Sequence, residues 1–191
     1  MADAPDRPSA LSVRERRLRS ERDLLRQLLD LNPETLGVCG VDESADAVRI
    51  ALRRTCGIIG LSPQRTLSHD HEVRLLFPRF YPAMPIEAYL TQPVFHPNVD
   101  PRNGFVCLWT RASPGDTIIE ALCRLQRIIA WELVNLDATH VMQPGAVDWY
   151  RQPTLRLPLD YTSVVVPQEF YLERSFAQLQ GGRQRHRLND P

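Results

Sequence analysis

Apolar residues near the N-terminus recur at the spacing of one helix face. The segment 13–31, VRERRLRSERDLLRQLLDL, surrounds this stripe with Arg and Glu, a pattern typical of an amphipathic helix. Ser12 precedes the segment, Glu15 stands at the capping-box position, and Asn32 comes before a proline that predicts the helix end. The apolar stripe consists of Val13, Leu18, Leu25, Leu28 and Leu29.

Four later segments have the apolar alternation of strands and predict an antiparallel meander. The segment 60–70, GLSPQRTLSHD, predicts a loop within it. The prolines of PRFYPAMP, at 78–85, require an extended connection, and the Tyr81-Pro82 bond is a candidate for the cis form. The predicted strands are 34–41, 48–59, 71–77 and 86–92.

A second helix is predicted at 117–134, with Asp116 as its cap and Cys123 packed within it. The residues 135–152 then predict a loop and a short helix, and the chain beyond 155 could add a strand and a helix. We therefore expect a flexible N-terminus at 1–12, one α+β domain at 13–152 and a C-terminal extension at 153–191. The last residues of this extension, about ten, are expected to be disordered.

Composition narrows the possible partners and compartment. The 191 residues carry 23 basic and 23 acidic side chains, and this zero net charge argues against nucleic acid or a membrane surface as the main partner. The N-terminus lacks the layout of a secretory signal, which favours a cytoplasmic, reducing compartment. The four cysteines show neither a CxxC pair nor zinc-type spacing, so we expect free thiols, no metal and no cofactor.

All 23 basic residues are Arg, and the sequence contains no Lys. Codon bias in a GC-rich genome is one explanation. The other is chemical, because a Lys amine readily accepts an activated acyl group whereas a guanidinium stays protonated and non-nucleophilic. A protein that holds a reactive thioester would modify itself less without lysines.

The segment 95–109, FHPNVDPRNGFVCLW, places a turn motif close before a cysteine. A cysteine in an apolar run is ordinarily an inert core residue. Here the whole order of helix, meander, proline-rich connection, HPN motif and cysteine resembles the ubiquitin-conjugating enzymes over roughly residues 13–152. The matching residues are Phe77-Pro78, Tyr81-Pro82, Pro85, Phe95-His96-Pro97-Asn98, Gly104, Cys107-Leu108 and the MQPGAVDWYR segment at 142–151.

The resemblance implies a UBC-like fold with an N-terminal helix, a four-stranded antiparallel meander, an active-site loop, a crossing helix and C-terminal helical segments. It also implies a transferase that carries a ubiquitin-like protein as a thioester on Cys107 and passes it to an amine. A cysteine can attack and later leave without a catalytic triad. Asn98 would donate to the oxyanion or order its loop, although a role in the turn alone is the alternative. His96, Pro97, Gly104 and Trp109 would support the active-site loop.

The sequence departs from the family pattern near the site. Cys107 follows Asn98 by nine positions where eight are common, so the loop must bulge, and Trp109 stands where Asp is frequent. His140 aligns with an acidic residue that helps to deprotonate the incoming amine, and a histidine can do the same. Asp137 is the neighbouring candidate, and an ordinary loop role remains open for either residue.

The resemblance further implies three protein partners: a ubiquitin-like modifier, an activating enzyme and an acceptor protein. The basic face of the first helix, formed by Arg14, Arg16, Arg17 and Arg19, matches in position the face presented to the activating enzyme, or is simply solvated surface. Ala83 replaces an apolar residue that grips a ligase, which argues against a RING-type ligase. The lysine-free composition fits a bacterial conjugation operon of the kind linked to antiphage defence.

Two other functions are compatible with the sequence. A non-catalytic UBC-like module would dock a ubiquitin-like protein or an activating enzyme without carrying the modifier. A cysteine hydrolase would need a histidine base beside the thiol, for which His96 and His140 are the candidates. The LQGG at 179–182 is similar to the end of ubiquitin-like modifiers but is read here as chance.

Overall fold

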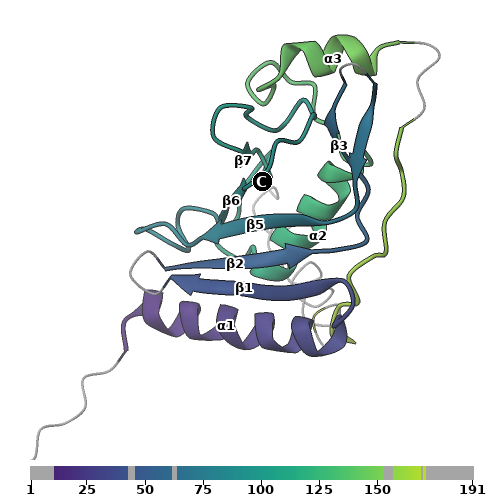
Figure 1. The fold of residues 1–191 in the computed structure, drawn as a ribbon. Helices are drawn as coiled ribbons and strands as arrows, with labels where there is room; N and C mark the ends of the chain where they lie inside the picture. Colours follow the sequence, from purple (N-terminus) through teal and green to yellow (C-terminus); the bar gives the residue numbers. More distant parts are fainter. Residues whose placement is uncertain (1–10, 43–45, 62–63, 153–156, 169, 171–191) are drawn as a thin grey trace, which may run out of the picture.

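A computed structural model of the chain describes residues 11–42, 46–61, 64–152, 157–168 and 170. Within these residues, a helix lies along the edge of an antiparallel sheet and a second helix packs on one face of it (Figure 1). The order of elements is α1 (Val13–Leu31), β1 (Leu36–Asp42), β2 (Ala47–Leu52), β3 (Gly57–Gly60), β4 (Thr66–Ser68), β5 (His71–Leu76), β6 (Glu87–Leu90), β7 (Phe105–Val106), α2 (Ile118–Ile129) and α3 (Pro144–Tyr150).

Helix α1 begins and ends where the sequence predicts. The Ser12 N–H donates to Oε2 of Glu15 at 2.7 Å, and the Glu15 N–H donates to Oγ of Ser12 at 3.2 Å, which confirms the capping box. Asn32 follows the last turn and its side chain donates to the Leu28 carbonyl at 2.8 Å. The predicted boundaries of this helix are confirmed.

The main sheet has the strand order β1-β2-β5-β6-β7, with every pair antiparallel. Strands β1, β2, β5 and β6 confirm the predicted meander. The prediction of one strand at 48–59 is wrong, because Arg54 has a φ of 54° and turns the chain after β2. The prediction of a loop at 60–70 is also wrong in part, since β4 pairs with β3 in a separate hairpin.

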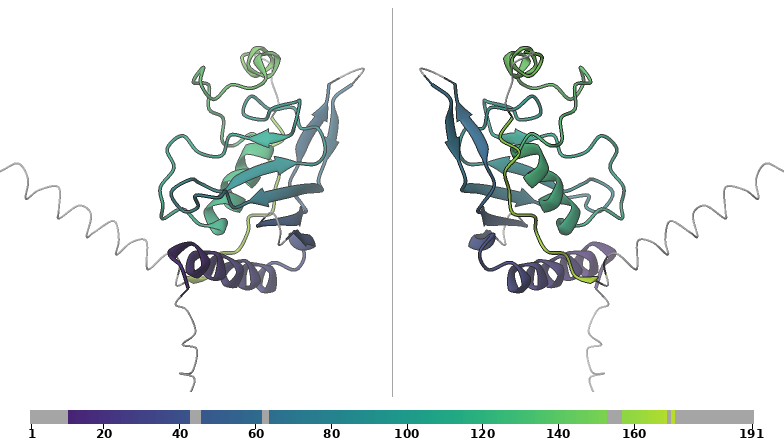
Figure 2. Two further views of the ribbon diagram at one scale, coloured as in Figure 1. Left: turned by 90° about the vertical axis from the view of Figure 1, so that its left-hand side faces the viewer. Right: turned by 90° about the vertical axis from the view of Figure 1, so that its right-hand side faces the viewer.

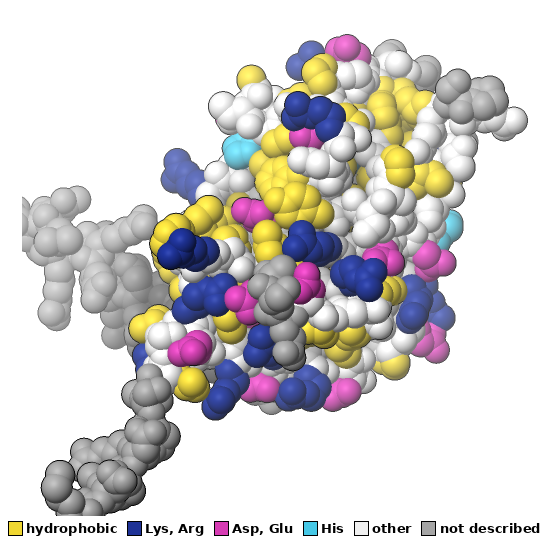
Figure 3. Space-filling view, turned by 60° about the vertical axis from the view of Figure 1, so that its left-hand side comes forward, with side chains coloured by type: hydrophobic (Ala, Val, Ile, Leu, Met, Phe, Trp, Pro, Cys, Tyr) yellow, Lys and Arg dark blue, Asp and Glu magenta, His cyan; other side chains and the backbone are white. Residues whose placement is uncertain are grey.

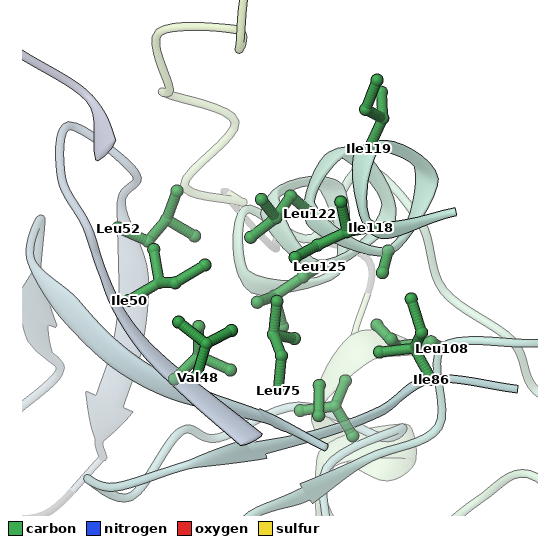
Figure 4. Packing of buried hydrophobic residues seen from close by; sticks show 14 of the residues in the cluster. Val48, Ile50, Leu52, Leu75, Ile86, Leu108, Ile118, Ile119, Leu122 and Leu125 are labelled. Atoms are coloured by element: carbon green, nitrogen blue, oxygen red, sulfur yellow. The ribbon is translucent and has the colours of Figure 1, made fainter. Parts of the chain in front are cut away.

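The hydrophobic core lies between the main sheet and α2 (Figure 4). Buried apolar side chains of β2 and β5 alternate with more exposed residues and point toward the helix, which places their apolar atoms out of water. Burying each large aliphatic side chain contributes about 1.5–3 kcal/mol to folding. The central residues are Val48, Ile50, Leu52, Leu75, Ile118, Leu122 and Leu125, each at most 5% exposed.

The start and end of α2 differ from the prediction. Its N-cap is Thr117, whose backbone N–H and hydroxyl both donate to Oε2 of Glu120. The expected cap, Asp116, instead accepts from the Ser113 N–H at 2.7 Å, so that assignment is wrong. The helix stops at Ile129 rather than 134 because Trp131 takes a left-handed φ of 62°.

The C-terminal residues 157–168 pass from α3 along α2 toward the end of α1 (Figure 2). A strand is not formed there, apart from a single β-bridge between Tyr161 and Thr55. The Gln126 side chain donates to the Thr162 carbonyl at 2.7 Å, and Oδ1 of Asn32 accepts from the Val165 N–H at 2.7 Å. The predictions of disorder at both ends and the LQGG segment fall largely or wholly outside the described residues.

Glu21 joins three parts of the fold through a fully buried carboxylate. Its Oε1 accepts from the Tyr81 hydroxyl at 2.6 Å and pairs with Nε of Arg17 at 2.8 Å. Its Oε2 accepts from the Ile118 N–H at 2.7 Å, at the start of α2. The Tyr81-Pro82 bond beside it is cis, as predicted. Glu21 therefore connects α1, the proline-rich connection and α2.

Replacing Glu21 with Ala should lower the free energy of unfolding by about 2–4 kcal/mol, because buried donors lose their acceptor. Urea denaturation followed by circular dichroism measures this change. The matched control is Glu34→Ala, which removes an ion pair between the exposed residues Glu34 and Arg54 and should cost about 1 kcal/mol or less. Equal losses in the two variants would show that Glu21 does not have this structural role.

Candidate functional site

Cys107 follows the short strand β7 and is half-buried, unlike Cys56, which is 3% exposed in the core. Its Sγ lies 3.0 Å from Nδ1 of His140, which belongs to the loop at 131–143 between α2 and α3. A thiol that is partly exposed and paired with an imidazole does not fit an inert core cysteine. The structure thus brings together two predicted site residues that are 33 positions apart.

Asn98 holds the loop that carries His140. Its side-chain Nδ2 donates to the Asn135 carbonyl at 2.7 Å and to the His140 carbonyl at 3.0 Å, and its Oδ1 accepts from the Asn135 N–H at 2.8 Å. The side chain is 1% exposed. The Asn98 carbonyl also accepts from the Cys107 N–H at 2.9 Å. Asn98 therefore bonds both to Cys107 and to the loop that carries His140, and both hydrogens of its side-chain amide take part in hydrogen bonds.

Further hydrogen bonds join the same two loops. The Pro97 carbonyl accepts from the Met142 N–H at 2.7 Å. The Gln143 side chain donates to the carbonyls of Val94 and Val99 at 2.9 and 2.8 Å. Gln143 and Asn135 were not predicted as site residues. The Gln143 side chain bonds to backbone carbonyls more than 40 positions away, and the Asn135 backbone bonds to the Asn98 side chain 37 positions away.

His96 lies beneath the loop and is fully buried. Its Nδ1 accepts from the Asn98 N–H at 3.1 Å, and its ring packs edge-on against Trp131 with 4.7 Å between ring centroids. Burial lowers the pKa of His96 to about 3, although the Leu133 backbone acts in the opposite direction. His96 is therefore neutral at physiological pH and does not reach the thiol.

The loop between the HPN motif and the cysteine reverses direction at residues 100–104. Gly104 has a φ of 75°, and a Cβ at this position would lie 2.1 Å from the Leu90 carbonyl oxygen. Its N–H donates to the Asp100 carbonyl at 2.9 Å. Only glycine fits this combination of backbone conformation and close approach.

Trp109 and Arg124 form the side of the site next to Cys107. The Trp109 indole N–H donates to the Ile86 carbonyl at 2.8 Å, which fixes the ring. Arg124 of α2 lies over that ring at 5.6 Å and its Nε donates to the Leu108 carbonyl at 2.7 Å. Arg124 was not predicted as a site residue, because its position in the sequence is typical of the polar face of an amphipathic helix.

The thiol of Cys107 is protonated in this environment. Burial raises its pKa above the usual range, and the nearby positive charge of Arg124 only partly opposes this. The S–H group can therefore donate to Nδ1 of His140 across the 3.0 Å contact in the tautomer that leaves this nitrogen without a proton. The pair differs from the thiolate–imidazolium ion pair of cysteine hydrolases, in which the pKa of the thiol is lowered.

Asp137 is exposed and lies in the same loop as His140. Its carboxylate accepts from the N–H and hydroxyl of Thr139, and these bonds, with the charge of His140, hold its pKa below the usual range. The Asp137 carbonyl accepts from the His140 N–H at 2.8 Å. No contact of Asp137 with Cys107 is present among the described residues.

The four arginines of α1 that were predicted to contact the activating enzyme fall into two groups. Arg14 pairs with Asp46 at 2.8 Å and donates to carbonyls of 77–79, whereas Arg17 binds Glu21 and the carbonyls of 115–116. Arg16 and Arg19 are exposed. On the face shown in Figure 3, basic and acidic side chains are interspersed. Only Arg16 and Arg19 of the four are fully exposed at the surface.

The described residues contain no group of three or more His, Cys, Asp or Glu side chains placed to hold a metal ion. In the same part of the chain, none of the helices has the length and apolar character to cross a membrane.

Acidification should destabilise the fold through His96. Its pKa is 6.5 in the unfolded chain and about 3 when folded, so between these values only the unfolded chain binds the proton. The free energy of unfolding should fall by up to about 1.4 kcal/mol for each pH unit below 6.5. Urea denaturation at pH 7, 6 and 5 measures how steeply the free energy of unfolding falls with pH. In His96→Asn this fall should be smaller by up to about 1.4 kcal/mol for each pH unit. An unchanged slope would contradict the assignment.

Asn98→Ala should release the loop at 131–143, because three hydrogen bonds are lost inside the protein. We expect a loss of about 2–4 kcal/mol of stability and faster hydrogen exchange at 135–140. The matched control is Asn103→Ala in the same turn, since the exposed Asn103 accepts a single bond from the Phe105 N–H. Exchange at 135–140 that is unchanged in Asn98→Ala would rule out this role.

Comparison with known proteins identifies the fold. A family model for the ubiquitin-conjugating enzyme matches residues 50–130, which include Asn98 and Cys107 but not His140. A protein from Trypanosoma cruzi that is assigned as a ubiquitin-conjugating enzyme is 17% identical, with a TM-score of 0.55 over 73% of this chain and 91% of that one. One from Plasmodium yoelii with the same assignment is 17% identical, with a TM-score of 0.51 over 72% and 84%. A search of curated proteins gave no match. These comparisons support a relationship to the ubiquitin-conjugating enzyme family, and the chain has the UBC fold.

Proposed function

We propose that the protein carries a ubiquitin-like modifier as a thioester on Cys107 and transfers it to an amine of an acceptor protein. The observation that carries this proposal is the position of the thiol, half-exposed at the end of β7 and 3.0 Å from a potential proton acceptor. The UBC fold and the HPN sequence before the cysteine support the same function. A non-catalytic docking module would not need this pairing of thiol and imidazole.

Both halves of the proposed reaction are nucleophilic substitutions at a carbonyl carbon. In loading, the Cys107 sulfur replaces the sulfur of an activating enzyme at the C-terminal carbonyl of the modifier. In transfer, an amine nitrogen replaces the Cys107 sulfur, which regenerates the thiol as the amine loses a proton. His140 and Asp137, both in the 131–143 loop, are the proposed acceptors of this proton.

Asn98 acts in this proposal as a positioning residue. Both of its amide hydrogens are bonded to carbonyls of the 131–143 loop, so a bond to the oxyanion would require one of those to break. The hydrogen bonds support the second role that the family resemblance offers, which is to order the active-site loop. The turn-only alternative is less well supported, because the side chain bonds to residues 37 and 42 positions away.

The proposed partners are an activating enzyme, the modifier and the acceptor protein. Arg16 and Arg19 are proposed to contact the activating enzyme, since both are exposed. Arg14 and Arg17 are better explained as structural residues of the fold. The lysine-free composition supports a carrier that avoids modifying itself, in a bacterial cytoplasmic conjugation system of the antiphage type.

The cysteine hydrolase is a second candidate that one observation favours, because His140 does lie beside the thiol. Burial nevertheless raises the pKa of Cys107, whereas a hydrolase requires a thiol whose pKa is lowered. The surrounding fold is also that of carriers. The carrier is therefore the better supported function.

The carrier proposal is tested by mixing the protein with its modifier, activating enzyme and ATP. Wild type should form an adduct that a reductant removes, and Cys107→Ser should form a reductant-resistant ester or no adduct. Gel electrophoresis with and without reductant distinguishes these products. The matched control is Cys39→Ser, which changes the exposed cysteine of β1 and should leave the adduct intact. If Cys107→Ser behaves like wild type, the proposal is wrong.

A further inference from the structure

We infer that His140 is the base that takes the proton of the Cys107 thiol during loading, in addition to any role toward the acceptor amine. The inference rests on the proposed carrier function and deepens it. It comes from one contact, the 3.0 Å between Sγ of Cys107 and Nδ1 of His140. A base intended only for an incoming amine would not need to lie against the sulfur itself.

The position of His140 is fixed through its backbone on both sides. Its N–H donates to the Asp137 carbonyl at 2.8 Å, and its carbonyl accepts from Nδ2 of Asn98 at 3.0 Å. Asn98 is in turn bonded through its own carbonyl to the N–H of Cys107. The backbones of the histidine and the cysteine are thus held by the same residue, which keeps the two side chains within reach of each other.

The proposed step balances in protons and bonds. As the Cys107 sulfur attacks the carbonyl carbon of the activating-enzyme thioester, Nδ1 of His140 accepts the S–H proton. The tetrahedral intermediate then collapses, which breaks the bond to the activating enzyme's sulfur. That thiolate leaves and takes up the proton from the imidazolium, so His140 is neutral again when the new thioester is complete.

Two charged side chains are the electrostatic neighbours of this pair. Arg124, from α2, favours the thiolate form of Cys107, and Asp137, from the same loop as His140, favours the imidazolium. Both charges stabilise the separated pair that proton transfer creates. Burial of the sulfur has the opposite effect, so an ionised thiol does not form readily without a nearby proton acceptor.

The test is the rate at which iodoacetamide alkylates Cys107 between pH 6 and 10, in wild type and in His140→Asn. Mass spectrometry of the peptide that contains Cys107 separates its reaction from that of the other three cysteines. At pH 7 we expect alkylation to be roughly tenfold slower in the variant, because the thiol has lost its base. The two rates should converge above about pH 10, where hydroxide ionises the thiol directly.

The shape of the pH profile distinguishes a base from a structural residue. The ratio of the wild-type rate to the His140→Asn rate should fall toward one as the pH rises, because hydroxide takes over the role of the base. The matched control is His69→Asn, which changes an exposed histidine outside the site and should have the wild-type profile. Equal rates in wild type and His140→Asn, or a loss of the same factor at every pH, would overturn the inference.

A second measurement follows loading without a partner protein. A glycylglycine thioester of mercaptoethanesulfonate can transfer its acyl group to Cys107, and the mass of the product reports the reaction. Transfer at pH 7 should be roughly 10²-fold slower in His140→Asn than in wild type. Equal transfer rates would contradict the inference. Because both probes are small molecules, the result is independent of whether a modifier is carried, which the Cys107→Ser experiment decides.

Discussion

The side-chain amide of Asn98 is the interaction on which the rest of the site depends. This amide is buried and bonds to the backbone at Asn135 and His140. The backbone carbonyl of the same residue accepts from the Cys107 N–H. If this buried amide lost its partners, the free energy of unfolding would fall by about 1–3 kcal/mol for each unsatisfied group. The two loops are therefore held in one arrangement, and the backbones of Cys107 and His140 cannot separate without breaking several hydrogen bonds together.

This arrangement explains how a thiol can be unreactive at rest and still serve as a nucleophile. Burial keeps the Cys107 thiol protonated in the absence of a substrate, which lowers its reactivity below that of a free thiolate. The adjacent imidazole offers a route for the proton once a carbonyl carbon is in place. Arg124 and Asp137 flank the pair with opposite charges, so that charge separation within it is favoured. The proposed chemistry thus needs neither a metal nor a pre-formed thiolate.

Sequence reasoning was sufficient where the determining contacts are local. The capping box of Ser12 and Glu15 and the apolar stripe behind it predicted α1, and the HPN motif predicted the loop of the cysteine. It was wrong at the start of α2, where two neighbouring residues compete for the cap: Thr117 bonds to Glu120, whereas Asp116 accepts from Ser113. Gln143 was missed because its partners are distant backbone carbonyls of another loop. The sequence pattern around a side chain does not indicate which distant backbone carbonyl it will bond to in the folded protein.

The most direct test of the account is a double-mutant cycle on the rate of Cys107 alkylation at pH 7. If Asn98 influences the thiol only by holding His140 in place, Asn98→Ala should slow wild type but have almost no effect in a His140→Asn background. The coupling free energy between Asn98 and His140 should then nearly equal the whole effect of Asn98→Ala in the wild-type background. Equal slowing by Asn98→Ala in both backgrounds would show that the two residues act independently, and would contradict the account.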